Sequence, residues 1–138
     1  MSKISHLKKL PSSGARQYEQ AHFIWNVLAA WVQYRKKELI TYGELAIILG
    51  YEPQAGRTLA PALGMVSLYC LYNDLPPLSC IVVAKGSKKP GWEGMIPENS
   101  TSAKEQKKVW KTNWHLYRTP TAGTFRKVKE ELSWNDYI

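Results

Sequence analysis

Hydrophobic residues near the start of the chain recur with the period of an α-helix. Ile24, Leu28 and Trp31 lie on one stripe, and the pattern predicts an amphipathic helix over residues 17–37. Aromatic side chains in such a pattern belong more often to a core than to a ligand platform. We therefore expect the residues that flank the stripe to pack inside the domain: Phe23, Val27 and Tyr34.

A short second helix is marked at both of its ends. Thr41 and Glu44 have the spacing of a capping box, in which the hydroxyl and the carboxylate each bind a backbone N–H that the helix leaves unpaired. Gly50 supplies the left-handed residue that commonly follows a helix. These signals predict a helix over residues 42–49.

A third helix follows a tight turn over residues 51–54. Proline is tolerated only near the start of a helix, so Pro61 indicates that this helix begins near Ala55 or Gly56. Two helices joined by a tight turn have the layout of a helix-turn-helix unit. The buried side of the third helix is expected to carry three apolar residues: Leu59, Leu63 and Val66.

A strand and a basic loop come next. The apolar run over residues 78–84 predicts a buried strand, and the glycine-flanked residues 91–94 mark the far side of a hairpin. A hairpin directly after a helix-turn-helix unit is a wing. The loop at its tip carries Lys85, Lys88 and Lys89, which are cations on a flexible loop, as phosphate contacts require.

Residues 102–117 return to a helical pattern with an apolar side and a basic side. A short final helix is predicted over residues 121–132. The apolar side carries Val109, Trp110, Trp114 and Tyr117. The basic side, which we expect to face solvent more than a partner, carries Lys104, Lys107, Lys108 and Lys111.

Together these elements predict an α+β fold that is mostly helical. We expect a winged helix-turn-helix domain with a short β-hairpin wing and an extra C-terminal helical segment. Residues 1–15 are expected to form a flexible basic tail and residues 16–98 the winged-helix domain. Residues 99–138 are expected to be a C-terminal helical extension packed on the same domain.

The charge of the chain narrows the class of partner. Nineteen Lys and Arg residues against eleven Asp and Glu residues give a formal net charge of +8. This balance favours an anionic partner, nucleic acid first and an acidic membrane surface second, while basic charge that serves only solubility stays an alternative.

Other features of the composition point away from several protein classes. No apolar run reaches the roughly 18 residues of a membrane span, and the polar, basic N-terminus is unlike a signal peptide. The two cysteines make no disulfide framework, and the three histidines make no metal-ligand spacing with them. We expect a cytoplasmic monomer with no cofactor, metal or membrane contact.

Three short motifs carry a resemblance to a known family. The sequence YGELA at residues 42–46, followed by AGR at 55–57 and ALG at 62–64, resembles the DNA-binding domain of the alkylguanine-DNA alkyltransferases. It looks most like their non-enzymatic relatives, the alkyltransferase-like proteins. The resemblance covers roughly residues 20–95, and its two-part motif is more specific than YGELA alone.

The resemblance implies a particular way of contacting DNA. In that family the second helix of a winged helix enters the minor groove, and an arginine at its start fills the space left by a nucleotide that has rotated out. A tyrosine on the preceding helix crowds the adjacent phosphate. Arg57 and Tyr42 match these positions, and the expected DNA-binding surface also includes Thr58 and the three loop lysines. A planar guanidinium suits the role, since it can stack and can hydrogen-bond the unpaired base.

The chain departs from the family where the enzymes hold their nucleophile. Those enzymes carry Pro-Cys-His-Arg before the wing, whereas residues 78–83 here read LSCIVV. One alignment puts Ser79 at the nucleophile position and Cys80 at the histidine position. Shifting the alignment by one residue puts Cys80 at the nucleophile position and Ile81 at the histidine position. Neither alignment places a base next to a thiol, which activation of the nucleophile requires. Cys80 is expected to be a small buried residue in a strand.

A second departure is an insertion between Gly64 and Pro76, which lengthens the third helix and would alter any pocket for an alkylated guanine. The leading hypothesis is therefore a non-enzymatic protein that binds double-stranded DNA and recognises damaged, distorted or modified bases by nucleotide flipping.

Three alternatives stay open. The chain could be a winged-helix regulator or an accessory factor of a repair or host–phage conflict system, with a repair or defence protein as a further partner and no flipping. It could be an alkyltransferase that uses Cys80, or a protein-interaction module built on the C-terminal helix. Arg57 and Tyr42 would then be an ordinary surface arginine and a packing residue.

Overall fold

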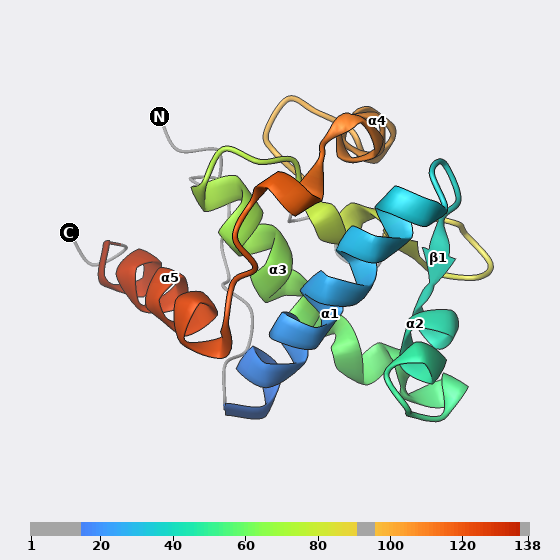
Figure 1. Ribbon diagram of the computed structural model, residues 1–138, viewed down its shortest axis with the longest axis horizontal. Coiled ribbons are helices and arrows are strands. Elements are labelled where there is room, and N and C mark those ends of the chain that lie inside the picture. The colour runs from blue at the N-terminus through green and yellow to red at the C-terminus, as the bar shows by residue number, and fades with distance from the viewer. Residues whose placement is uncertain (1–14, 91–95, 136–138) are drawn as a thin grey trace.

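The computed structural model describes residues 15–90 and 96–135, and it shows a mostly helical molecule with one small parallel sheet (Figure 1). The elements follow in the order α1 (Ala15–Tyr34), β1 (Ile40–Thr41), α2 (Tyr42–Ile48), the 3-10 helix η1 (Pro53–Leu59), α3 (Ala60–Tyr72), the 3-10 helix η2 (Leu78–Ile81), β2 (Val82–Val83), α4 (Ser102–Lys111), the 3-10 helix η4 (Trp114–Leu116) and α5 (Ala122–Asn135). The α+β class and the helical content agree with the sequence. The predicted tail falls almost wholly outside the described residues.

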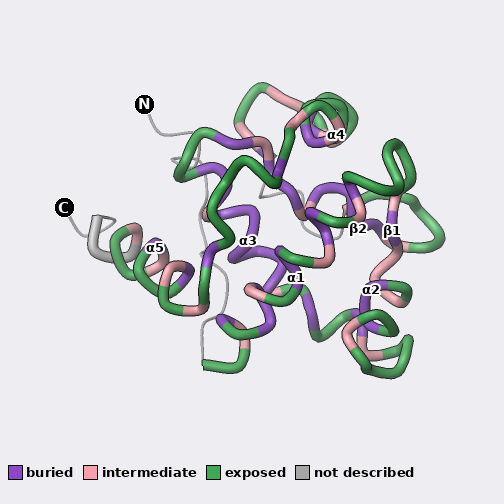
Figure 2. Tube along the Cα trace, in the orientation of Figure 1, coloured by how far each residue is buried: buried purple, intermediate pink, exposed green. Residues whose placement is uncertain are grey.

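The core is built around α1 and α3, which cross each other in the centre of the molecule (Figure 1). Every residue of α3 from Ala62 to Leu68 is buried, so this helix is covered on all sides (Figure 2). The predicted buried residues Leu59, Leu63 and Val66 are confirmed. Within the described residues, no helix combines the length and the apolar composition that a membrane span requires.

The aromatic residues of α1 divide between core and surface. Trp25 is buried and meets the rings of Tyr69 and Trp114 edge-on, each with a centroid separation of 5.5 Å. Phe23 and Tyr34 are 57% and 84% exposed, so the expectation that they pack in the core is wrong. They lie on the side of α1 that no other element covers enough to bury them, which the helical period alone does not reveal.

The predicted start and stop signals of α2 are both confirmed. The Glu44 amide donates to the Thr41 hydroxyl at 3.1 Å, and the Thr41 amide donates to the Glu44 carboxylate at 3.1 Å, which completes the capping box. Gly50 has a φ of +91°, the left-handed conformation that ends the helix. The sequence therefore fixes both ends of this short helix.

The start of the third helix is where the prediction fails. Residues 53–59 form η1, and the α-helix begins only at Ala60, so Arg57 lies in a 3-10 segment and not in the first turn of α3. Pro61 gives the reason, because its ring would clash with the Arg57 carbonyl of an α-helix and it has no N–H to donate. The Ala60 amide bonds to that carbonyl in 3-10 fashion instead.

Residues 78–84 are not the continuous strand that their apolar character predicts. The Ser79 hydroxyl donates to the Leu63 carbonyl of α3 at 2.7 Å, and the Cys80 amide donates to the Pro77 carbonyl at 3.0 Å. The chain therefore turns against α3 as η2 before it becomes β2. A short apolar run that is buried on all sides has the same sequence signature whether it is a strand or a turn.

The two strands bring the segment before α2 next to the segment after η2. β1 directly precedes α2 and β2 follows η2, and they pair in parallel, with Ile40 opposite Val82 and Thr41 opposite Val83. Within the described residues β2 pairs only with β1, and the return of the predicted hairpin, residues 91–94, lies outside them, so the hairpin stays a prediction.

The C-terminal segment adds two helices at separate places. α4 lies at the top of Figure 1 beside η2, and α5 lies at the left against α1 and α3. The single helix predicted over residues 102–117 is wrong beyond Lys111. The indole N–H of Trp114 donates to the Val109 carbonyl at 3.1 Å, so the chain folds back after α4 as η4. The final helix is confirmed and extends to Asn135.

The contact between η1 and α2 yields a stability prediction. A Cβ atom on Gly56 would lie 2.8 Å from the carbonyl carbon and oxygen of Tyr42, whereas a Cβ on Gly86 would meet nothing within 4 Å. We expect Gly56→Ala to lower the free energy of unfolding by about 1–3 kcal/mol. Gly86→Ala should change it by less than about 0.5 kcal/mol. Chemical denaturation measures both, and an equally small effect of the two substitutions would contradict the close contact.

Candidate nucleic-acid interface

An open surface groove brings together three residues that the sequence singles out. Tyr42, Arg57 and Lys85 all line it, although they come from α2, η1 and the turn after β2. We call it the Arg57 groove, and its remaining lining residues are Thr41, Gly43, Pro53, Gln54, Gly56, Ala84 and Gly86. Its volume is about 790 Å³.

A glycine at position 56 allows the elements of this groove to approach each other, and Gly43 lies at ordinary contact distance. Gly56 packs against the backbone of Tyr42 at a distance that leaves no room for a side chain, and a Cβ on Gly43 would lie 3.5 Å from the Pro53 carbonyl oxygen. The first turn of α2 and the 3-10 helix η1 are therefore in backbone contact. Arg57 follows Gly56 directly, so this contact fixes where its side chain leaves the surface.

The Arg57 guanidinium is exposed and unengaged. It has no hydrogen-bond or ion-pair partner among residues 15–90 and 96–135. The neighbouring Thr58 is also exposed, but its hydroxyl donates to the Ala55 carbonyl at 2.6 Å. Thr58 therefore stabilises the turn of η1, while the Arg57 side chain engages no described residue.

Two backbone hydrogen bonds close the turn after β2, which carries three lysines. The Ala84 amide donates to the Lys89 carbonyl at 2.9 Å, and the Lys88 amide donates to the Ala84 carbonyl at 2.8 Å. Lys88 adopts a left-handed φ of 58°, which lets the chain reverse. All three lysines, Lys85 included, are exposed.

The lysines of the turn divide between two grooves. Lys85 lines the Arg57 groove, whereas Lys88 and Lys89 line a second groove with the start of α4. We call the second one the α4 groove, and its remaining lining residues are Pro90, residues 96–103 and Gln106. The turn over residues 84–90 is thus the wall that the two grooves share.

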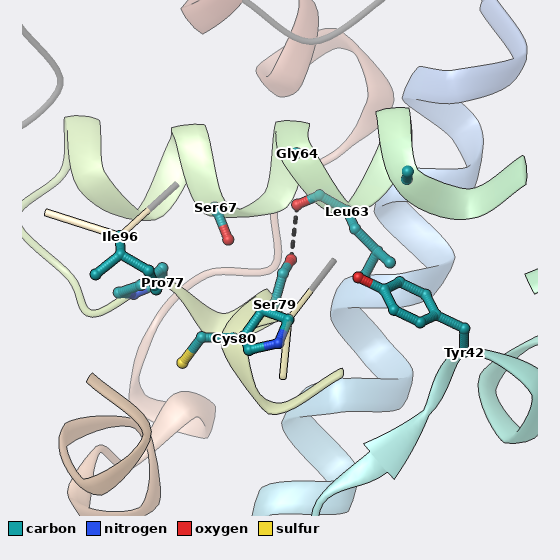
Figure 3. A pocket seen from close by; sticks show the side chains of 10 residues that line it. Tyr42, Leu63, Gly64, Ser67, Pro77, Ser79, Cys80 and Ile96 are labelled. Atoms are coloured by element: carbon teal, nitrogen blue, oxygen red, sulfur yellow. Dashed lines mark hydrogen bonds between the residues drawn. The ribbon is translucent and has the colours of Figure 1, made fainter. Parts of the chain in front are cut away.

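A small, partly open cavity lies behind Tyr42, between α3 and η2 (Figure 3). Its volume of about 30 Å³ is far below the roughly 300 Å³ of the smallest usual ligand sites. Tyr42 lines this cavity as well as the Arg57 groove. The room for a nucleotide is therefore in the groove and not in the cavity.

Two serine hydroxyls face the cavity, and only one of them has a partner. Ser79 donates to the Leu63 carbonyl, while the hydroxyl of Ser67, which is 1% exposed, finds no hydrogen-bond partner in the described structure (Figure 3). Sequence reasoning missed Ser67. It lies within the apolar run of α3, and no pattern in the sequence marks its side chain as unpaired.

Cys80 has the buried surroundings of an unreactive thiol. Its side chain is 3% exposed and points away from the Ser79 hydroxyl (Figure 3). Burial raises the pKa of its thiol, and the charge of Glu105 raises it further. The expected burial is confirmed, although the residue lies in η2 and not in a strand. A raised pKa removes the thiolate that a nucleophile needs.

Two of the three histidines lie among the described residues. The Nδ1 atom of His22 is 2.8 Å from the Pro120 carbonyl oxygen, and His115 is exposed within η4. No group of three or more His, Cys, Asp or Glu side chains within the described ranges is arranged to hold a metal ion.

Comparison with models of known protein families, with curated proteins and with solved structures found no match to this chain.

The burial of the cysteines predicts how they react. Burial also raises the pKa of the Cys70 thiol to about 12. We expect a thiol-alkylating reagent at neutral pH to leave both cysteines of the native protein unmodified over a period in which it modifies both in the unfolded protein. Intact-mass measurement follows the modification. Native Cys80 that reacts as fast as the unfolded thiol would overturn its placement.

Proposed function

We propose that this chain is a non-catalytic, duplex-DNA-binding protein of the alkyltransferase-like type, which probes for damaged, distorted or modified bases. The observation that carries the proposal is the Arg57 groove, which the unengaged guanidinium of Arg57, the exposed Lys85 and the half-buried Tyr42 all line. The YGELA and AGR motifs that suggest the family meet in space at this groove.

A winged-helix arrangement is the architecture we propose for DNA contact. α2, η1 and α3 would form the helix-turn-helix unit, and the turn over residues 84–90 would be the tip of the wing. The parallel pairing of β1 with β2 supports it, since it holds the segment before α2 next to the segment that leads into the turn. The turn over residues 84–90 and the segment that carries Arg57 would then both line the Arg57 groove.

Arg57 would enter the duplex where a nucleotide leaves the stack. Unstacking a base costs a few kcal/mol, and a planar cation that fills the gap and bonds the unpaired base offsets part of this cost. Arg57 is suited to the task because it leaves the surface from a segment held by backbone contact with Tyr42. Tyr42 would crowd the phosphate of the displaced nucleotide.

Most of the affinity would come from charge. The net charge of +8 and the exposed lysines of the turn favour contact with phosphates, which gives affinity that falls steeply as salt is raised. The buried Cys80 supports binding without alkyl transfer, because burial and the charge of Glu105 both raise the pKa of its thiol and so disfavour the thiolate.

Replacing Arg57 tests the flipping step. We expect Arg57→Ala to weaken binding to a duplex that contains O6-methylguanine about tenfold more than binding to the same duplex with guanine, a difference of about 1.4 kcal/mol. Lys85→Gln is the matched control, since it removes a charge from the same groove without removing a planar group. Mobility-shift titrations at low salt measure both.

Equal losses on the two duplexes after Arg57→Ala would remove the flipping claim. A wild-type protein that does not bind duplex DNA at low salt would remove the proposed function altogether.

Replacing the lysines at the tip of the turn tests the phosphate contacts. We expect the double substitution Lys88→Gln/Lys89→Gln to weaken binding to plain and to lesion-bearing duplexes equally. It should also reduce the magnitude of the slope of log affinity against log salt by about 2. The control removes two charges from Arg118, which is exposed before α5, and Lys127, which is exposed on α5; neither residue lines the two grooves. A salt slope that stays the same in the Lys88/Lys89 variant would contradict a role in phosphate contact.

A further inference from the structure

α4 carries a basic face that the proposed function does not use. The helix has four lysines, Lys104, Lys107, Lys108 and Lys111, and all four are exposed. Its one acidic residue, Glu105, is 2% exposed and is already bonded. The outer surface of α4 is therefore basic without an acidic side chain of its own to balance it.

The only ion pair that α4 makes within the described structure leaves three of these lysines unpaired. Lys108 contacts the Glu105 carboxylate at 3.0 Å, and the Ser100 hydroxyl donates to the same carboxylate at 2.6 Å. Lys104, Lys107 and Lys111 have no hydrogen-bond or ion-pair partner from the side chain among the described residues. Their charges are available to an external partner.

α4 also holds these charges in a fixed position. The Gln106 side-chain amide donates to the Cys80 carbonyl at 2.8 Å, which ties the helix to η2. Val109 is fully buried, and its carbonyl accepts from the Trp114 indole at 3.1 Å. A basic surface on a rigid element loses little conformational freedom on binding beyond that of the lysine side chains themselves.

The position of α4 places part of this face next to the turn lysines. Lys88 and Lys89 form one side of the α4 groove, and Ala103 in the first turn of α4 lies on another. Lys107 and Lys111 follow Ala103 at intervals of four residues, so they continue along the same face of the helix. The basic surface thus runs from the Arg57 groove over the turn and along α4, past one acidic lining residue, Glu98.

We infer that Lys107 and Lys111 form a second phosphate-contacting surface, which binds the duplex beyond the segment reached by the turn lysines. This inference rests on the proposed DNA-binding function and extends its footprint. The two lysines lie one helical turn apart, about 6 Å along the axis of α4. Because each strand of the duplex carries a phosphate about every 3.4 Å of its axis, lysines about 6 Å apart on flexible side chains can meet two phosphates of one strand at the same time.

The experiment compares duplexes of two lengths. Wild-type protein, the Lys107→Gln/Lys111→Gln variant and the Arg118→Gln/Lys127→Gln control are titrated with plain duplexes of about 10 and about 20 base pairs, where one helical turn is roughly 10 base pairs. We expect the α4 variant to lose about three- to tenfold in affinity for the long duplex and less than about twofold for the short one, with a salt slope lower by about 2 on the long duplex alone. The control should change little at either length.

A charge-preserving variant separates contact from folding. Lys107→Arg/Lys111→Arg should bind both duplexes like the wild type, because it keeps both charges on the same helix face. If the Gln variant matches the control on the long duplex, while Lys88→Gln/Lys89→Gln weakens binding, the inference fails and the proposed function stands. If wild-type protein binds neither duplex, the proposed function fails and the inference fails with it.

A third outcome would assign the surface to a different partner. Wild-type binding to vesicles with acidic headgroups, lost in the Gln variant while the affinity for both duplexes is kept, would overturn DNA as the partner of α4.

Discussion

The position of Arg57 depends on a contact between two backbones. Gly56 approaches Tyr42 so closely that a Cβ atom would lie 2.8 Å from the Tyr42 carbonyl group. Pro61 adds a second constraint, because it prevents the α-helix of α3 from extending back over residue 57. Arg57 is therefore carried by a tight 3-10 turn pressed against the start of α2, with its side chain exposed on the groove that Tyr42 and Lys85 also line. The interface follows from these two steric limits more than from any single hydrogen bond.

The chemistry of the molecule is divided between an inert interior and a charged exterior. The two thiols are buried and hard to ionise, and the cavity beside Cys80 is only large enough for a few waters. Four exposed cationic residues, Arg57, Lys85, Lys88 and Lys89, instead line two open grooves that share one turn. This division agrees with the proposed binding of a polyanion without a covalent step.

The parts of the fold that the sequence predicts well are those with local causes. The capping box of Thr41 with Glu44, the left-handed Gly50 and the apolar stripe of α1 each act over a few residues, and each is found in the structure. The parts that it does not predict depend on contacts between distant segments. η2 turns because Ser79 bonds to α3, and the chain after α4 turns because Trp114 bonds back to Val109. At the site, the motifs indicate Tyr42 and Arg57, but their meeting with Lys85 at one groove, and the separation of Lys88 and Lys89 into another, come only from the packing.

The central claim is that Arg57 takes the place of a nucleotide that leaves the duplex. The most direct test is to place the fluorescent base 2-aminopurine at the lesion position and to measure its emission with the protein at saturating concentration. Because stacking quenches this base, rotation out of the duplex predicts a rise in emission with the wild-type protein and a much smaller rise with fully bound Arg57→Ala protein. An emission that stays at the level of the free duplex when the wild-type protein is fully bound would contradict the account.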